Sequence, residues 1–467
     1  MIFTTVLLSL AAVGSAKPWT LLNDSGGQSE ESSLINDDEK AFRLRSRDLL
    51  RQGFKLTVHD VKASTAPTVD KVTQNVVQLY TGSGTGPSQR YIQLLNSAKA
   101  NIGNGTIKNW IDQVYMTPVT IGGQEFFAAV DTGSSDTWVI QEGYKCTMPQ
   151  TAGNAAGECG FGKAYKKSPT FASAGNEIFS INYPSESVSG VMGTETITLG
   201  NITVKDQKLA LVDTARWRGD GTSSGLIGLA FPSNSATWDI TGGKNDYSPI
   251  FTTMHKQNLV APYFSLALNR RSEAPGILAL GGLPGGNIKY NTTWAKTPMQ
   301  YLTFSNDDAT KKPFGDFDYR LYRTSIESFT IGNQPSVQPS AKDGAVAETQ
   351  VSIDSGTAAM LLPSDIAESF NAQWEPPATF EGSAGWVVDC TAKAPKFGVK
   401  IGGVMLYVDS EDLMTPHEPG MPGTKCGSAV QQAGPPGSGM LGSTFLKSVV
   451  AVFDVGGAQL RFAQRIR

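Results

Sequence analysis

The stretch FFAAVDTGSSDTWVI, residues 126–140, places an acidic tight turn between two apolar runs, and VSIDSGTAAMLLP, residues 351–363, repeats the pattern. Asp131 and Asp354 hold corresponding positions in the two copies. Each copy is followed at a similar distance by an apolar-apolar-Gly element, in GLIGLAFP and then in GMLGSTFL. This internal duplication predicts two similar lobes related by an approximate two-fold axis, with the acidic turns facing each other at the junction.

A single Asp-Thr-Gly turn is weak evidence for a site, because Asp and Gly are common in turns for purely backbone reasons. Here, apolar runs precede and follow the turn, which predicts that buried strands hold it rigidly. Gly133 and Gly356 would let the backbone approach a carboxylate closely. The duplication makes a chance arrangement improbable, so we expect two carboxylates to meet.

Two carboxylates a few Å apart repel by about 4 kcal/mol at an effective dielectric constant of about 20. One proton is therefore shared by the pair over a wide acidic range. The ionised carboxylate can take a proton from a water molecule, and the protonated one can donate a proton to a carbonyl oxygen. The sequence thus predicts amide hydrolysis at low pH without a covalent intermediate.

The turns DTGSSDTWV and DSGT, the two apolar-apolar-Gly elements and the closing pattern AVFDVGGAQLRFA resemble the pepsin family of aspartic endopeptidases in a secreted, fungal-type form. The resemblance covers the chain from about Ile107 to Arg467. It implies an all-β, bilobal fold with a deep cleft that holds an extended peptide. In that family a pair of aspartates shares a proton, and here the pair would be Asp131 and Asp354.

The resemblance also implies a flap, a β-hairpin that closes over the substrate. The segment INYPSESVSGVMGTETITLG matches it and places the flap tyrosine at Tyr183, which would exclude water and hydrogen-bond toward Trp138. Without the resemblance, Tyr183 is a strand aromatic with a structural role. The resemblance further implies that the hydroxyls of Ser134 and Thr357 bind the catalytic carboxylates. Thr132 and Ser355 lie directly beside the two aspartates and are expected to support the turns.

The chain departs from the family pattern at four positions. Pro184 stands where Gly is usual after the flap tyrosine and removes a backbone N–H that could bind substrate. Ala358 replaces a hydroxyl residue, so one contact to the substrate backbone is expected to be missing. Ser224 and Ser443 stand where the family often has Asp. These departures concern how substrate is held rather than where the chemistry occurs.

The cleft is expected to prefer apolar side chains on both sides of the scissile bond. Leu226, Trp217 and Ala129 are the candidate wall residues. The GTSSG motif offers Ser223 as a serine-hydrolase nucleophile, but that motif requires a strand directly before it, where ARWRGD stands here. We therefore expect this Gly/Ser run to be a loop near the cleft.

The composition also favours a β-rich fold. The 467 residues include 50 Gly and 25 Pro, with only 17% charged residues, which is typical of short strands joined by many turns. The net charge of -3 argues against a nucleic-acid binder. The sequence predicts no cofactor, and a monomer whose partners are a protein or peptide substrate and its own prosegment.

Four regions are expected along the chain. Residues 1–16 combine an apolar run with a small-residue cleavage site, which predicts a secretory signal peptide. Residues 17–103 form an expected prosegment, followed by an N-terminal catalytic lobe with the flap at 104–290 and a C-terminal catalytic lobe at 291–467. No later run reaches the roughly 20 apolar residues that cross a bilayer, so the mature protein is expected to be secreted and extracellular, without a membrane.

The expected prosegment holds more Lys and Arg than Asp and Glu, whereas the rest of the chain is acidic. An autoinhibitory segment would use such a charge contrast, although an ordinary solvated helix would show the same pattern. No Lys-Arg or Arg-Arg pair precedes Arg270, so a dibasic processing enzyme has no evident target. We expect a zymogen that cleaves itself in acid.

Export to an oxidising compartment predicts that the four cysteines form disulfides. Three pairings are possible, and sequence proximity favours Cys146 with Cys159 and Cys390 with Cys426. A metal site is not expected, because CxxC spacing is absent and the three histidines are scattered. The sequons that could carry glycans are Asn23, Asn104, Asn201 and Asn291.

One further hypothesis belongs to another functional class: a pepsin-like fold that has lost catalysis and acts as a binding or inhibitor protein. Such a protein would be expected to have replaced an aspartate of the pair or the flap tyrosine. Asp131, Asp354 and Tyr183 are all present, which favours an active endopeptidase.

Overall fold

The computed structural model describes most of the chain from residue 54 onward. The described residues are 54–66, 71–81, 114–148, 157, 159–183, 186–270, 273–306, 320–339, 350–382, 385–415, 425–433 and 439–467. The expected signal peptide, the sequons at Asn23 and Asn104, and Pro184 lie outside them.

Strands make up most of the described chain. From the N-terminus to the middle of the chain they are β1 (Phe54–Asp60), β2 (Val76–Thr81), β3 (Tyr115–Ile121), β4 (Gln124–Asp131), β5 (Thr137–Cys146), β6 (Ala172–Asn182), β7 (Ser187–Leu199), β8 (Ile202–Arg216), β9 (Gly225–Gly228), β10 (Thr237–Asp239), β11 (Tyr263–Ala267), β12 (Gly276–Leu280), β13 (Tyr290–Pro298) and β14 (Gln300–Asn306).

The remaining strands are β15 (Arg323–Ser325), β16 (Ser328–Ile331), β17 (Gln334–Val337), β18 (Gln350–Ile353), β19 (Met360–Leu362), β20 (Thr379–Phe380), β21 (Trp386–Asp389), β22 (Phe397–Ile401), β23 (Val404–Val408), β24 (Met414–Thr415), β25 (Lys425–Ser428), β26 (Val430–Gln432), β27 (Gly439–Leu441), β28 (Val449–Asp454) and β29 (Gln459–Arg465). In the described part of the chain, three short α-helices accompany them: α4 (Ile250–Lys256), α5 (Ser364–Asn371) and α6 (Ser443–Leu446). Among the described residues, no helix has both the length and the apolar character needed to cross a membrane.

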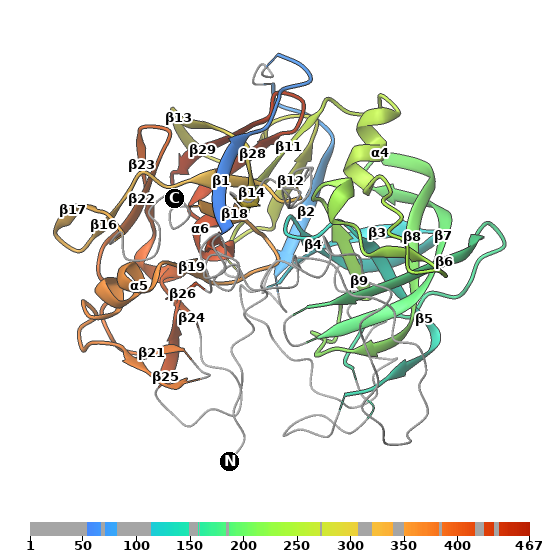
Figure 1. Ribbon diagram of the computed structural model, residues 1–467, viewed down its shortest axis with the longest axis horizontal. Coiled ribbons are helices and arrows are strands. Elements are labelled where there is room, and N and C mark those ends of the chain that lie inside the picture. Colours follow the sequence, from blue (N-terminus) through green and yellow to red (C-terminus); the bar gives the residue numbers. More distant parts are fainter. Residues whose placement is uncertain are drawn as a thin grey trace.

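The strands form two lobes, as the duplication predicted. Figure 1 shows β3 to β9 gathered on one side and β16 to β26 on the other. A large sheet runs through the first lobe in the order β10-β6-β7-β8-β5-β9-β4-β3 and continues as β2-β12-β11-β28-β29-β13 between the lobes. The second lobe contains the sheet β1-β14-β15-β18-β27-β19-β26 and two smaller sheets. The expected all-β, bilobal fold is confirmed.

The two lobes share one local topology around the acidic turns. In the first lobe, β9 pairs in parallel with β4, where Asp131 lies opposite Gly228, and antiparallel with β5. In the second lobe, β27 pairs in parallel with β18 and antiparallel with β19. The apolar-apolar-Gly strand thus lies between the strands that enter and leave each turn, and both strands are buried.

Aromatic packing joins the lobes beneath the turns. Phe264 of β11 stacks on Phe453 of β28 with ring centroids 4.6 Å apart. Tyr322 packs edge-on against Phe453 at 4.7 Å and donates a hydrogen bond to the carbonyl oxygen of Leu229 at 2.6 Å. Because Leu229 directly follows β9, this contact links the base of the Asp131 turn to the second half of the chain.

Both disulfides join the pairs that sequence proximity favoured. Cys146 is bonded to Cys159 and Cys390 to Cys426, with Cα–Cα distances of 5.6 and 5.0 Å. Each bond closes a loop within one lobe. The sequon residues Asn201 and Asn291 are exposed, as a glycan would require. Their glycosylation stays a prediction.

Candidate active site

Asp131 is the last residue of β4, so a buried strand fixes its position. Its Oδ1 accepts a hydrogen bond from the backbone N–H of Gly133 at 2.7 Å. Its Oδ2 accepts one from the hydroxyl of Ser134 at 2.5 Å. Two neighbouring residues, Gly133 and Ser134, therefore orient this carboxyl group before any substrate arrives.

Asp354 follows the last residue of β18 and has the same local partners. The backbone N–H of Gly356 donates to its Oδ1 at 2.8 Å, and the hydroxyl of Thr357 donates to its Oδ2 at 2.6 Å. The hydroxyls of Ser134 and Thr357 thus lie where the resemblance placed them. Their role in catalysis remains a prediction.

Reciprocal hydrogen bonds lock the two turns together. The hydroxyl of Thr132 donates to the carbonyl oxygen of Ile353 and accepts from the N–H of Ser355, both at 2.9 Å. In the opposite direction, the hydroxyl of Ser355 donates to the carbonyl oxygen of Val130 at 2.8 Å and accepts from the N–H of Thr132 at 3.1 Å. All four residues are buried, so water does not compete for these bonds.

Each turn also leaves space for the carboxyl group of the other. A Cβ atom on Gly133 would lie 2.5 Å from Oδ1 of Asp354, and one on Gly356 would lie 2.5 Å from Oδ1 of Asp131. Contacts this short are not tolerated, so only glycine fits at these two positions. The two carboxyl groups therefore lie side by side, each against the opposite turn.

The two carboxyl groups influence each other's protonation, because they lie side by side in a buried site. Burial raises the pKa of Asp354 well above its usual range, and the nearby negative charge of Asp131 raises it further. The hydrogen bonds from Thr357 and Gly356 oppose this shift only in part. The pair can therefore hold a proton on Asp354 under acidic conditions.

Tyr183 lies at the tip of the hairpin formed by β6 and β7, in the expected flap. The indole N–H of Trp138 donates a hydrogen bond to its hydroxyl oxygen at 3.2 Å. Its ring packs edge-on against Trp217, with centroids 5.3 Å apart. Burial raises the pKa of Tyr183 well above its usual value, and the negative charge of Asp131 adds to the shift, so the hydroxyl stays protonated.

The expected wall residues come together beside this flap. Trp217, Ala129 and Tyr183 pack against one apolar cluster that contains Trp138 and Leu226. The cluster lies on the Asp131 side of the pair, because Ala129 belongs to β4. An apolar surface is thus present next to the carboxyl groups.

Sequence reasoning gave Asp136 no role, although it belongs to the first acidic turn. Its carboxyl group is fully buried. The backbone N–H of Ala236 donates to this carboxyl group, with the shorter of its two N···O distances at 3.0 Å, and Tyr247 also contributes a hydrogen bond. Burial raises its pKa to about 7, against the opposing effects of these hydrogen bonds and of Lys244. The signal available in the sequence was an acidic residue two positions before the apolar run Trp138 to Ile140.

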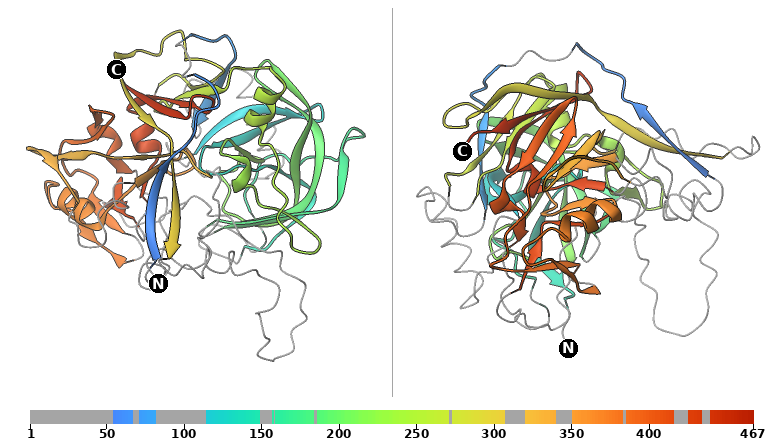
Figure 2. Two further views of the ribbon diagram at one scale, coloured as in Figure 1. Left: turned by 45° about the horizontal axis from the view of Figure 1, so that its top comes forward. Right: turned by 90° about the vertical axis from the view of Figure 1, so that its left-hand side faces the viewer.

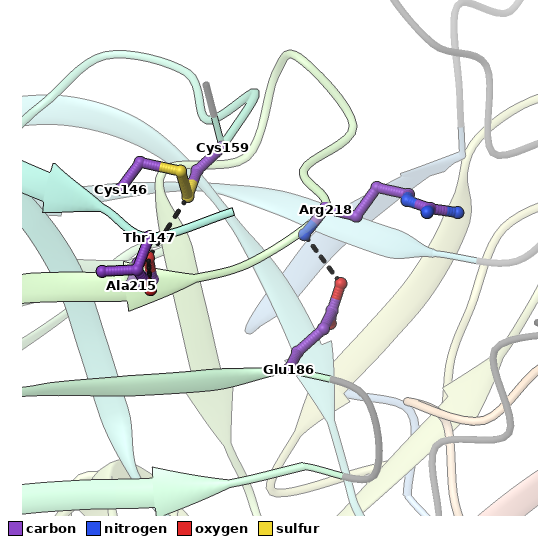
Figure 3. The surroundings of a disulfide bond; sticks show 6 residues. All are labelled: Cys146, Thr147, Cys159, Glu186, Ala215 and Arg218. Carbon is purple, nitrogen blue, oxygen red and sulfur yellow. Dashed lines mark hydrogen bonds between the residues drawn. A yellow bond between two sulfur atoms is a disulfide. The ribbon is translucent and has the colours of Figure 1, made fainter. Parts of the chain in front are cut away.

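Glu186 is a second buried acid that sequence reasoning missed. It lies three residues after Tyr183 in the flap, and its Oε1 accepts a hydrogen bond from the backbone N–H of Arg218 at 2.8 Å. In Figure 3 the Glu186 carboxyl group points toward this N–H, whereas the guanidinium group of Arg218 points away. Burial raises the pKa of Glu186 to about 7. The flap is therefore bonded directly to the loop that carries Trp217.

Asp220 belongs to the same loop. Its Oδ1 accepts hydrogen bonds from the N–H groups of Thr222 and Ser223, both at 2.7 Å. These bonds hold the GTSSG run as a turn before β9, in agreement with the expectation that this run is a loop. The Cys146–Cys159 disulfide lies against the end of β8, which leads into this loop, since the disulfide sulfur of Cys159 lies 3.5 Å from the carbonyl oxygen of Ala215 (Figure 3).

Comparisons with known proteins agree with this geometry. The family model for eukaryotic aspartyl proteases matches residues 114–465. A probable aspartic-type endopeptidase of Aspergillus fumigatus is 37% identical over 425 residues, covering 88% of this chain and 92% of the relative. Penicillopepsin-1 of Penicillium janthinellum is 28% identical, covering 75% of this chain and 95% of the relative. The chain therefore belongs to the eukaryotic aspartyl protease family and is an aspartic-type endopeptidase with a pepsin-like fold.

Proposed function

We propose that this protein is an acid endopeptidase in which Asp131 and Asp354 act as one catalytic pair. The observation that supports this most strongly is that each carboxyl group lies against the opposite turn, since a Cβ atom on Gly133 or Gly356 would lie 2.5 Å from the facing carboxyl oxygen. Burial and the charge of Asp131 both favour the protonated form of Asp354. This arrangement leaves one proton on the pair in acid, which is what activation of a water molecule requires.

In the proposed reaction the ionised carboxylate of Asp131 accepts a proton from a water molecule. The oxygen of that water attacks the carbonyl carbon of the scissile amide, while Asp354 donates its proton to the carbonyl oxygen. As the resulting diol collapses, the C–N bond breaks, Asp131 gives the proton it took from water to the departing amine, and one diol hydroxyl returns its proton to Asp354, which leaves a carboxylic acid and restores the pair. The hydrogen bonds from Ser134 and Thr357 keep both carboxyl groups oriented during these steps.

The proposed substrate is an extended protein or peptide chain with apolar side chains next to the scissile bond. The apolar cluster that includes Leu226, Trp217 and Ala129 supports this preference. Tyr183 would close over the substrate and exclude water, since its hydroxyl is already oriented by Trp138. The departure at Ala358 concerns a contact to the substrate backbone and leaves the pair unchanged.

We also propose that the protein is secreted as a monomeric zymogen. The apolar run and small-residue cleavage site at residues 1–16 support export, and two intact disulfides suit an oxidising compartment. Residues 17–103 carry more basic than acidic side chains, whereas the rest of the chain is acidic. This contrast supports a prosegment that binds the body of the enzyme until acid releases it.

The proposal is tested by incubating the purified protein with a peptide mixture near pH 4 and identifying the products by mass spectrometry. We expect cleavage between apolar residues, inhibition by a statine-type compound, and a loss of activity of about 10³-fold or more in Asp354→Asn. Asp206→Asn is the matched control, because Asp206 is exposed and its positive φ of 52° suits asparagine equally well. Undiminished cleavage by a folded Asp354→Asn variant would refute the mechanism.

A further inference from the structure

The flap turn is closed between Tyr183 and Glu186. The backbone N–H of Tyr183 donates to the carbonyl oxygen of Glu186 at 2.8 Å, and the N–H of Glu186 donates to the carbonyl oxygen of Tyr183 at 3.4 Å. Glu186 therefore lies directly across the turn from the residue that is proposed to close over the substrate. Any displacement of Glu186 would move Tyr183 with it.

Both sides of this turn contact adjacent residues of one loop. The ring of Tyr183 packs edge-on against Trp217, and the carboxyl group of Glu186 accepts the backbone N–H of Arg218 at 2.8 Å. Glu186 is only 8% exposed, so water competes little for this hydrogen bond. The flap is thus fastened at two neighbouring points, one apolar and one polar.

The Cys146–Cys159 disulfide lies at both ends of this loop, residues 216–218. Where the loop begins, Cys146 pairs in parallel with Ala215 at the end of β8. Where the loop ends, the N–H of Gly219 donates to the carbonyl oxygen of Cys159 at 2.7 Å. The disulfide joins these two contact points covalently (Figure 3). It therefore fixes the span that the loop has to bridge.

The segment after the disulfide packs against the chain beyond the loop at the level of the backbone. The N–H of Gly221 donates to the carbonyl oxygen of Gly160 at 2.7 Å, and the N–H of Gly162 donates to that of Ser223 at 2.8 Å. A Cβ atom on Gly219 would lie 2.1 Å from the carbonyl oxygen of Gly160. The two segments have no room to slide, so a displacement of the disulfide would be passed to the loop.

All of these contacts lie within the first lobe. The left view of Figure 2 shows β5 to β8, coloured cyan to green, on the side of the molecule away from the orange strands of the second lobe. The other disulfide, Cys390–Cys426, belongs to the second lobe, where Cys426 lies on β25. It is a matched control for the first disulfide, because it closes a loop far from the flap.

We infer that Glu186 is a positioning residue that fastens the flap to the loop at residues 216–218, and that the Cys146–Cys159 disulfide fixes this loop and thereby the place of Tyr183. This inference rests on the proposed function, in which the flap closes over the substrate. Glu186 acts through Tyr183, so its loss should weaken the binding of a peptide while the chemistry of the two carboxyl groups continues.

The first test compares Glu186→Ala with Glu186→Gln in pre-activated enzyme at pH 4. Burial raises the pKa of Glu186 to about 7, so its carboxyl group is neutral at pH 4, and glutamine keeps the oxygen that accepts from Arg218. We expect KM for a peptide substrate to rise about 10-fold in Glu186→Ala, with kcat within about 2-fold, and Glu186→Gln to restore the wild-type KM.

Glu142→Ala is the control for this comparison, because Glu142 is exposed on β5. An unchanged KM in Glu186→Ala would overturn the inference. An equal rise of KM in Glu186→Gln would overturn it too, since acceptance of the Arg218 N–H would then not be what holds the flap.

The second test removes the disulfide with Cys146→Ser and Cys159→Ser. In this background Glu186→Ala should raise KM by less than about 2-fold, because the loop no longer holds the flap in place. In a background with Cys390→Ser and Cys426→Ser, Glu186→Ala should keep its full effect of about 10-fold. Equal effects of Glu186→Ala in the two backgrounds would contradict the inference.

Hydrogen exchange followed by mass spectrometry tests the same contact with both disulfides intact and without catalysis. We expect the amides of residues 179–183 and 216–219 to exchange about 10-fold faster in Glu186→Ala, while those of β22 and β23 exchange as in the wild-type protein. Unchanged exchange in the flap would overturn the inference even if the protein cleaves peptides. Faster exchange in a protein that cleaves no peptide would show that Glu186 holds the flap and that the proposed function fails.

Discussion

The turns at Asp131 and Asp354 have the same hydrogen-bond pattern but different surroundings. Each carboxyl group accepts one backbone N–H and one hydroxyl, and the reciprocal bonds of Thr132 and Ser355 are matched. Five positions after Asp131, however, stands the buried acid Asp136, whereas the corresponding position after Asp354 is the apolar Ala359. The comparison indicates that the two lobes orient their carboxyl groups in the same way, while the first lobe carries more of the pH dependence of the stability of the fold.

The largest expected effect comes from removing this difference with Asp136→Asn. Because burial raises the pKa of Asp136 to about 7, the folded protein keeps the proton while the unfolded chain loses it above about pH 4. The free energy of unfolding should therefore fall by about 4 kcal/mol as the pH rises from about 4 to about 7, and level off above that. Asparagine does not ionise, so the variant should keep this stability at pH 7.

Denaturant unfolding of the activated enzyme at several pH values between 4 and 7.5 measures the effect. Asp206→Asn is again the control, since Asp206 is exposed. If Asp136→Asn and the wild-type protein lose stability in parallel over this range, burial of Asp136 is not the cause of the pH dependence.

The next largest effect concerns the reciprocal hydrogen bonds of Thr132 and Ser355, which are the same in both turns. Thr132→Val and Ser355→Ala each leave buried backbone groups without partners at the junction of the turns. We expect each variant to lose about 2 kcal/mol in the free energy of unfolding, with the double variant losing less than the sum. Thermal unfolding of the three variants measures this. A large loss in one single variant and none in the other would show that the two turns are not equivalent.

The duplicated turns allowed both carboxyl groups to be predicted, because a local motif encodes each turn, and the family resemblance of these motifs implied their hydroxyl partners. The apolar-apolar-Gly elements likewise predicted the strands beside them, since their pattern repeats. Asp136 was missed because its burial depends on Ala236, which lies 100 positions away in the sequence. Burial of Glu186 similarly depends on the loop at Arg218, and no local pattern distinguishes a buried acid from an exposed one in a turn.

The strand β2, which comes first along the chain among the strands of the large sheet, was also not predicted. The segment that contains β2 is flanked by polar and Gly/Ser-rich stretches, whose composition indicated a prosegment. Three of its side chains are buried: Val77, Leu79 and Tyr80. Their burial can be recognised only once β12 and β3 are known to lie on either side of β2. Pairing between strands far apart in the sequence leaves little trace in a short stretch of residues.

A smaller effect concerns the flap, which lies against the Asp131 side. Tyr183→Phe keeps the ring contact with Trp217 and removes the hydroxyl that accepts from Trp138. We expect kcat/KM for a peptide substrate to fall about 10-fold, the equivalent of about 1.4 kcal/mol, with little change in Tm. Tyr407→Phe on the exposed face of β23 is the control. An unchanged kcat/KM would mean that the hydrogen bond does not position the flap for catalysis.

The smallest expected effect is that of Glu186→Gln. Arg218, Asp220 and Tyr183 are the charged or titratable groups near this carboxyl group. Burial raises its pKa to about 7, so at pH 4 the neutral acid resembles glutamine and the variant should match the wild-type enzyme. Toward pH 7 the wild-type carboxyl group ionises, and we expect KM to rise a few-fold more than in the variant.

The pH dependence of KM and kcat measures this difference, and Glu142→Gln serves as the control because Glu142 is exposed on β5. A variant with weaker binding at pH 4 would show instead that the carboxylic acid has a role that an amide cannot fill.

The central claim is that the two turns form one catalytic unit. Steady-state kinetics of Asp131→Asn, Asp354→Asn and the double variant, measured on pre-activated enzyme near pH 4, test it most directly. If the two carboxyl groups act together, each single variant should lose about as much kcat/KM as the double variant. Losses in the two single variants that multiply in the double variant would show two independent contributions and contradict the account.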